Sequence, residues 1–195
     1  MSIAELSAER LKGFSDAVFA VVITLLVLEL RPPHTDDFAA LLELWPSGVA
    51  YFVSYLFLAI VWVNHHHLMR YAPLATPRLI WANFAHLFSA SLVPFTTAWI
   101  ADTHLGRAPV FLYALVFVLV NATYLVLCME GIDRQDAGVV PPDVRKTMRR
   151  RSVLTLILFG AAAVIALWLP VGGLLLICAC LVMYVRPDVR SRAIG

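Results

Sequence analysis

The chain has 195 residues, of which 61% are hydrophobic and only 14% are charged, and its mean hydropathy is +0.82. A soluble domain is usually about half apolar and about a quarter charged, so this composition excludes an ordinary soluble protein and indicates an integral membrane protein. The net charge of +2 is informative only through its distribution along the chain.

Six stretches approach the roughly 20 apolar residues that a helix needs to cross the hydrocarbon core of a bilayer. These stretches are 13–30, 44–69, 78–101, 108–129, 152–169 and 171–185. The last two are short and are joined by WLPVGG, which predicts a tight hairpin. The expected fold class is therefore all-α: a polytopic membrane protein with six transmembrane helices per subunit in a single domain of residues 1–195.

Two features modify this pattern of helices. Pro94 lies inside the third run, where neighbouring helices can satisfy the carbonyl that a proline frees, so it predicts a kink and not a helix end. The polar stretch 130–151 predicts a basic loop, or a loop with a short basic helix after Pro142. The three cysteines all lie in apolar runs and indicate neither a disulfide framework nor a zinc site.

The distribution of Lys and Arg predicts the orientation, because cytoplasmic loops carry an excess of these residues. Alternating crossings place 13 of the 15 Lys and Arg residues on one side, six of them in the stretch 130–151. The other side has only Arg31 and Arg107. The sequence therefore predicts a multi-pass protein of the cell membrane with both termini in the cytoplasm.

Polar side chains of the first three runs are expected at one depth, near the cytoplasmic side. A carboxylate in a bilayer is costly unless it has a partner. Arg10 lies six residues from Asp16 and so on a different helix face, which leaves Asn, His or Trp donors of the second and third helices, or of a neighbouring subunit, to bond Asp16. This predicted polar layer consists of Arg10, Phe14, Ser15, Asp16, Asn64, His65, His66, Trp81 and Asn83, with Trp62 at the same depth and His86 somewhat deeper.

Helical periodicity divides the first run into two faces. The face that we expect to pack inward consists of Asp16, Phe19, Ala20, Ile23 and Val27. The other face consists of Val21, Thr24 and Leu28, with Leu25 at its edge. From periodicity alone, lipid exposure or helix packing is the simplest explanation of this second stripe.

Arg10, followed by three residues and then by Phe14-Ser15-Asp16, opens the first helix of a chain of this size. This pattern resembles that of the transmembrane protein 175 family of potassium channels. The segments AVFAVVITLLVLEL, VNHH and SLVPF are also similar to that family, and the similarity covers most of the chain.

The resemblance implies a homotetramer in which the first helix of each subunit lines a central pore that conducts potassium ions. In this family, bulky apolar residues on the first helix form a constriction in place of a carbonyl filter, and this sequence contains no TVGYG-like loop. Carried onto this chain, the constriction is Val21, with Thr24 one turn further along and Leu25 and Leu28 lining the outer part. Isoleucine or leucine would be expected at the narrowest ring, so the smaller Val21 predicts a wider pore or a narrowest ring at Leu25 or Leu28. The polar layer would then hold the pore helix and would not bind ions.

Three consecutive histidines raise the alternative of a metal site. Successive helical residues point about 100° apart, so His65, His66 and His67 cannot all bind one ion, and Asp16 or His86 would have to complete the site. Hydrogen-bonding histidines are the better explanation. No metal and no cofactor are expected, other than permeant potassium ions.

Other classes of function compete with a channel. No nucleophile–base spacing, phosphate-binding loop or carboxylate pair supports an enzyme. A proton- or cation-coupled transporter that uses Asp16 and the histidines is the main alternative, although it predicts internal repeats and carboxylates at the midplane. The basic run RKTMRRR is explained as a cytoplasmic anchor in contact with membrane lipid, and it predicts no nucleic-acid binding.

Overall fold

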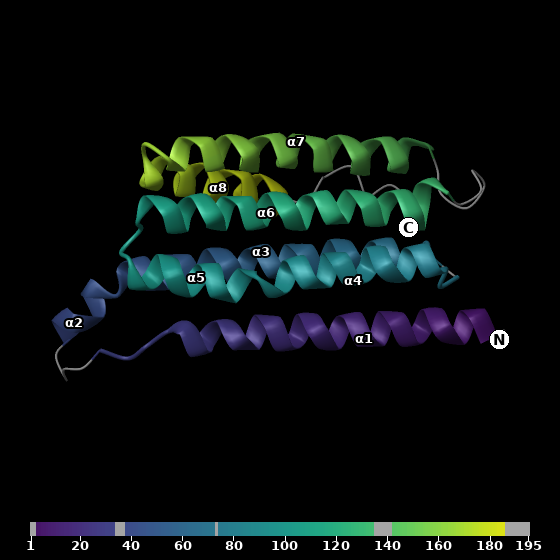
Figure 1. Ribbon diagram of the computed structural model, residues 1–195, viewed down its shortest axis with the longest axis horizontal. Helices are drawn as coiled ribbons and strands as arrows, with labels where there is room; N and C mark the ends of the chain where they lie inside the picture. The colour runs from purple at the N-terminus through teal and green to yellow at the C-terminus, as the bar shows by residue number, and fades with distance from the viewer. Residues whose placement is uncertain (1–2, 34–37, 73, 135–141, 186–195) are drawn as a thin grey trace.

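The computed structural model describes residues 3–33, 38–72, 74–134 and 142–185, and all regular structure within them is helical. The helices are α1 (Ile3–Leu25), which continues into a 3-10 turn (Leu26–Glu29), α2 (Phe38–Glu43), α3 (Trp45–Met69), α4 (Pro77–Ser91), α5 (Val93–Asp102), α6 (Arg107–Cys128) with a π-helical turn (Met129–Asp133), α7 (Pro142–Ala166) and α8 (Pro170–Val185). Figure 1 shows that the long helices lie side by side along one common direction.

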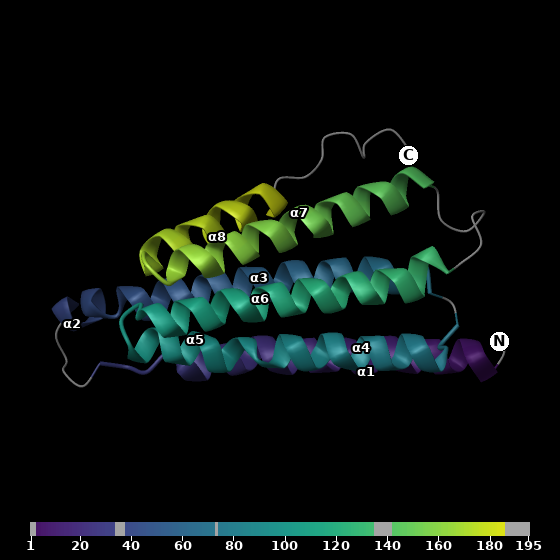
Figure 2. The ribbon, with the colours of Figure 1, turned by 45° about the horizontal axis from the view of Figure 1, so that its top comes forward.

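The helices form three layers. In Figure 2, α1 and α4 lie at one side, α3 and α6 lie in the middle, and the α7–α8 hairpin lies at the other side. The helix α6 packs against α4, α5, α7 and α8, whereas α1 packs mainly against α3 and α4. The helix α1 is therefore peripheral within its own chain.

Four stretches of the described residues are long and apolar enough to cross a membrane. They are Ala8–Glu29, Trp45–Met69, Pro77–Asp102 and Arg107–Asp133. The helix α8 is apolar but shorter, and α7 carries a cluster of basic residues in its first half. The expected all-α membrane protein is confirmed, while crossings by α7 and α8 stay a prediction.

The third run is interrupted at one residue, Leu92, between the end of α4 at Ser91 and the start of α5 at Val93. Pro94 has no N–H with which to bond the carbonyl of Ala90, four residues earlier. The two helices nevertheless follow one another in the same direction (Figure 1) and together form one candidate span. The helix is thus interrupted next to Pro94 and continues beyond it, while the predicted kink itself stays a prediction.

Two helix boundaries differ from the predicted ones. For the stretch 130–151, the alternative with a helix after Pro142 is the correct one, but that helix is not short. The helix α7 begins at Pro142 and runs for 25 residues, and residues 135–141 lie outside the described residues. Proline suits the first turn of a helix, where its missing N–H would be unbonded anyway, and the Arg, Lys and Met residues that follow favour helix. The helix α1 likewise begins at Ile3 and not near residue 13.

The core between the layers is closely packed. The rings of Phe57 on α3 and Phe117 on α6 stack with centroids 3.5 Å apart, and Phe159 on α7 meets both edge-on. Gly173 brings α8 against α7: a Cβ atom added there would lie 2.8 Å from the carbonyl oxygen of Ala162 and 2.9 Å from the Cβ of Ala166. Only glycine permits this close approach.

The described charges gather at the two ends of the bundle. One end, called here the basic end, holds the start of α1, the α3–α4 connection and the start of α7, with Lys12, Arg70 and Arg78 among its cations. The opposite end holds Arg31 and Arg107, and Arg31 lies 3.9 Å from the carboxylate of Asp102. This separation agrees with the asymmetry from which the orientation is predicted.

Candidate functional site

The carboxylate of Asp16 on α1 meets a donor from α3. Trp62 donates its indole N–H to Asp16 Oδ1 at 2.9 Å, and a bond to a charged acceptor is stronger than one between neutral groups. Arg10 is exposed and forms no ion pair with Asp16 in the described part of the chain. A hollow of about 240 Å³ beside Asp16 is lined by Glu9, Lys12, Gly13, Asp16, His65, His66, Met69 and Arg70.

A second set of hydrogen bonds joins α1, α3 and α4 at one buried point. Asn83 donates from Nδ2 to Ser15 Oγ at 2.9 Å, and its Oδ1 accepts from His65 Nε2 at 2.7 Å. The Ser15 hydroxyl donates in turn to the carbonyl of Leu11 at 2.8 Å. Ser15, His65 and Asn83 are all at most 1% exposed. Since buried polar groups are costly without partners, this chain of bonds fixes the position of α1 against the bundle.

Two buried histidine rings lie next to this point. The rings of His65 and His86 are nearly parallel with centroids 5.9 Å apart, and Phe19 of α1 contacts both. His86 Nδ1 lies 3.2 Å from the Thr123 hydroxyl on α6. His65 Nδ1 and His86 Nε2 are buried and have no hydrogen-bond partner within the described part of the chain. Among the described residues, no three His, Cys, Asp or Glu side chains are grouped so that they could hold a metal ion.

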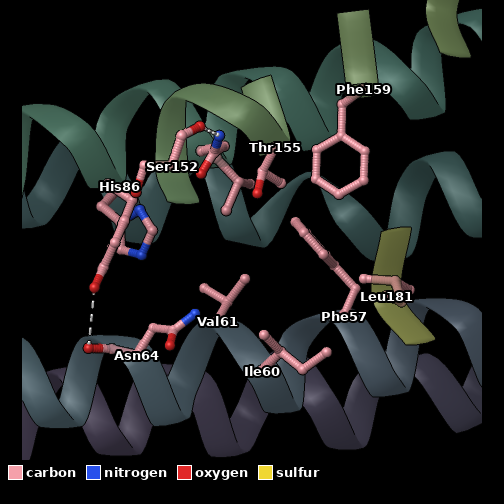
Figure 3. A pocket seen from close by; sticks show the side chains of 12 residues that line it. Phe57, Ile60, Val61, Asn64, His86, Ser152, Thr155, Phe159 and Leu181 are labelled. Atoms are coloured by element: carbon pink, nitrogen blue, oxygen red, sulfur yellow. Dashed lines mark hydrogen bonds between the residues drawn. The ribbon is translucent and has the colours of Figure 1, made fainter. Parts of the chain in front are cut away.

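His86 also lines a small cavity inside the bundle (Figure 3). Its polar end is formed by His86 with Asn64, Ser152 and Thr155, and its apolar end by Phe57, Phe159 and Leu181. The backbone carbonyl of Asn64 accepts a bond of 3.4 Å from the Tyr124 hydroxyl. The cavity volume is about 40 Å³, which is room for roughly three water molecules.

The structure brings together only part of the predicted polar layer. Ser15, Asp16, His65 and Asn83 converge as described, but Asn64 lines the internal cavity instead. The other four predicted residues lie at the surface. Arg10 is exposed, Phe14 is 48% exposed against Phe84, Trp81 is 75% exposed, and the exposed His66 ring lies 5.6 Å from that of Trp62.

Another buried polar cluster was not predicted from the sequence. Ser54 on α3 has its hydroxyl 2.7 Å from those of both Thr97 on α5 and Tyr113 on α6. All three residues are at most 2% exposed. The signal available in the sequence was the presence of hydroxyl residues within each of three apolar runs, since such groups in a membrane helix can bond across helices.

The inward face of α1 is rotated by one residue from the predicted face. The buried residues are Ala8, Leu11, Ser15, Phe19, Val22 and Leu26. The prediction is correct for Phe19 and wrong for Ala20 and Val27, which are exposed, Val27 by 51%. It assumed that Asp16 points into the core, whereas Asp16 reaches its partner Trp62, itself 37% exposed, at the edge of the interface.

The opposite face of α1 is apolar and exposed within the single chain. Val21, Leu25 and Leu28 are 55%, 42% and 71% exposed. Thr24 is also exposed, and its hydroxyl donates to the carbonyl of Val21 at 2.9 Å. We call these four residues the outer stripe of α1. The stripe lies inside the candidate span Ala8–Glu29. The described part of the chain therefore leaves an apolar face of a candidate membrane span largely exposed.

Comparison with known proteins points to one family. Residues 10–94 match the family described as the endosomal/lysosomal potassium channel TMEM175. A potassium channel of Chamaesiphon minutus is 30% identical over 203 residues, which cover 94% of this chain and 95% of the relative. A potassium channel of a Chryseobacterium species is 37% identical over 118 residues, but the match spans only 62% of that relative's length and 60% of this chain.

The fold is similar to that of a solved channel. The crystal structure described as a lysosomal potassium-selective channel TMEM175 homolog from Chamaesiphon minutus superposes with a TM-score of 0.74 at 29% identity, over 92% of this chain and 99% of the other. The agreement extends over nearly the whole length of both proteins, including the helices that carry Asp16, His65 and Asn83. This chain belongs to the TMEM175 family of potassium channels.

Proposed function

We propose that the chain assembles as a homotetramer in the cell membrane and conducts potassium ions through a central pore lined by α1, with weak to moderate preference over sodium. The observation that carries the proposal is the outer stripe of α1, an apolar face with Val21, Leu25 and Leu28 between 42% and 71% exposed in the single chain. Relatives that are named potassium channels support the choice of ion.

The outer stripe supplies a gate of the hydrophobic kind. Four copies of an apolar side chain around one axis form a ring that expels water when it is narrower than a hydrated ion, and loss of water blocks conduction. Val21 is the proposed constriction, Thr24 lies one turn further along, and Leu25 and Leu28 line the outer part. A small rotation of α1 would widen the ring and admit water again.

The polar bonds of α1 have a structural role in this proposal. The bonds of Asp16 to Trp62 and of Ser15 to Asn83 lie on the side of α1 that faces α3 and α4, away from the outer stripe. They hold the pore helix and leave the stripe free to face the pore axis. The basic end would lie in the cytoplasm, and α7 and α8 would complete six crossings as a hairpin.

A coupled transporter is the weaker alternative. It requires carboxylates near the middle of the membrane. Within the described spans, Glu9, Glu29, Asp102, Glu130 and Asp133 lie toward the ends of their spans, and the remaining carboxylate, Asp16, is engaged by Trp62. The carboxylates of the described spans therefore give this alternative little support.

The proposal is tested by ion flux from liposomes that contain the purified protein. Flux is measured under a potassium gradient and then under a sodium gradient, for the wild type and for Val21→Asn, Thr24→Ala and Leu28→Asn. Val164→Asn is the matched control, because Val164 lies on α7 and is 53% exposed. The expected result is flux that favours potassium, rises in the asparagine variants of the stripe and is unchanged by the control. Absence of flux for both ions from tetrameric protein, or equal effects of stripe and control, would overturn the proposal.

A further inference from the structure

A hollow lies between the two helices of the α7–α8 hairpin. The described part of α7 has 25 residues and that of α8 has 16, and the two are joined by a short turn. At 1.5 Å per residue, α7 extends about 13 Å further toward the basic end than Val185, the last described residue of α8. Figure 2 shows this first part of α7 continuing past α8.

The hollow lies between the two helices and has a volume of about 200 Å³. Arg150 and Arg151 lie at its mouth, and the side chains of Leu154, Leu158 and Met183 line its walls. Leu154 and Met183 are 51% and 57% exposed, whereas the hydroxyl of Thr155, also in the lining, donates to the carbonyl of Arg151 at 2.8 Å. The hollow therefore presents cationic groups at one end and apolar side chains at the other.

The charge around the mouth is strongly positive. Residues 142–151 contain five cations and a single carboxylate in the sequence. Arg145, one turn away, is directed elsewhere, since it donates to the carbonyl of Asp133 at 3.1 Å. Guanidinium groups bind phosphate in a forked geometry with charge-assisted hydrogen bonds. An anionic phosphate group therefore fits the mouth.

The position of the hollow relative to the bilayer indicates which kind of molecule carries the phosphate. Arg150 and Arg151 immediately precede the apolar run of α7, so they lie where a helix enters the headgroup region of a bilayer. Leu154 and Leu158 follow at one-turn intervals on the same face, at the depth of acyl chains. A free phosphate ion would leave this apolar wall uncovered, and a zwitterionic headgroup would bring its own cation against the arginines.

We propose that the hollow between α7 and α8 binds one anionic phospholipid of the leaflet at the basic end, with its phosphate on Arg150 and Arg151 and an acyl chain along Leu154, Leu158 and Met183. The site is separate from the outer stripe of α1, because it lies on the opposite side of the bundle (Figure 2). It does not depend on ion conduction, and it would be present even if the protein conducts nothing.

The first test measures lipid binding to the purified full chain by native mass spectrometry. The protein in detergent is titrated with dioleoylphosphatidylglycerol and, separately, with dioleoylphosphatidylcholine, which has the same chains. The double variant Arg150→Gln/Arg151→Gln is expected to bind the anionic lipid roughly 10- to 30-fold more weakly, because it loses the charge-assisted hydrogen bonds to the phosphate. Lys146→Gln/Arg149→Gln removes the same charge from α7 without altering the lining of the hollow, and should change binding less than about 3-fold. Equal loss in both double variants, or equal binding of the two lipids, would overturn the proposal.

The second test concerns the apolar wall. Leu154→Trp fills the hollow without changing charge, whereas Ile157→Trp places the same side chain at a position that is 62% exposed and outside the lining. Weaker binding of the anionic lipid in Leu154→Trp alone supports an acyl chain in the hollow. Equal binding by both variants, or full displacement of the lipid by millimolar inorganic phosphate, would overturn it and identify a site for free anions. Unchanged oligomeric mass in the same spectra controls for folding.

Discussion

Trp62 donates its indole N–H to the carboxylate of Asp16 at 2.9 Å, at the edge of the interface between α3 and α1. The contact gives the Asp16 carboxylate a hydrogen-bond donor without placing that carboxylate in the core. It also leaves the outer stripe on the far side of the helix. The position of the pore helix proposed here therefore depends on a bond that is itself partly exposed.

A double-mutant cycle measures the strength of this bond. Asp16→Ala and Trp62→Phe are each expected to lower the free energy of unfolding in detergent, and their coupling energy should be about 1–2 kcal/mol, as for a hydrogen bond to a charged group. Thermal unfolding of the two single variants and the double variant gives the value. Strictly additive effects would show that the bond does not contribute to stability.

Asn83 is expected to be the most sensitive polar residue of the layer. Asn83→Ala removes two hydrogen bonds, leaves the His65 ring buried without its partner and leaves Ser15 only its bond to the carbonyl of Leu11, which should cost about 2–4 kcal/mol of stability. Unfolding of the detergent-solubilised protein, followed by tryptophan fluorescence, checks this. Ser91→Ala is the matched control, because that hydroxyl is exposed and bonds only to the carbonyl of Phe88 in its own helix. A similar loss in both variants would contradict the prediction.

The size of Val21 offers a test of which ring is narrowest. If Val21 forms the constriction, Val21→Leu adds one methylene group per subunit to the ring and should reduce potassium flux several-fold. Leu25→Val removes one group per subunit from the neighbouring ring and should leave the flux nearly unchanged. The reverse pattern in the same liposome assay would place the constriction at Leu25.

The contact of α8 with α7 predicts opposite effects of two glycine substitutions. Gly173→Ala places a methyl group within 3 Å of the backbone of Ala162 and the side chain of Ala166, so it should destabilise the protein by about 1–3 kcal/mol through overpacking. Gly160→Ala meets no atom within 4 Å and should stabilise α7 by about 0.5–1 kcal/mol, because alanine favours helix. Thermal unfolding of both variants measures these changes. Equal shifts of the unfolding temperature in the same direction would contradict the close packing of α8 against α7 at Gly173.

Much of the fold could be predicted from the sequence. The length of each apolar run and the uneven distribution of Lys and Arg are properties of whole helices, so they do not depend on the detail of side-chain packing. The convergence of Asp16, His65 and Asn83 was predictable from depth alone, since alternating helices bring their ends to the same level. The buried face of α1 could not be predicted in the same way, because helical periodicity does not show which of two adjacent rows of side chains packs against the bundle. Asp16 indicated the row with Ala20, whereas the packing of Phe19 and Leu26 favours the adjacent one.

Contacts between distant helices were the least predictable part. The hydroxyls of Ser54, Thr97 and Tyr113 meet only because α3, α5 and α6 pack together, and no single run contains that information. The length of α7 was not predicted for a different reason. The charged stretch was compatible with a loop or with a short basic helix after Pro142, although Arg, Lys and Met are good helix formers and proline commonly occupies the first position of a helix.

The two faces of α1 have different consequences for evolution. Phe19, Val22 and Leu26 are buried against the rest of the subunit, so substitutions there carry a folding penalty. Val21 and Leu28 lie largely outside that packing, and exchanging one apolar side chain for another there costs the subunit little stability. With the outer stripe lining the pore as we propose, conduction can diversify by drift along one row of a helix while selection for folding preserves the adjacent row.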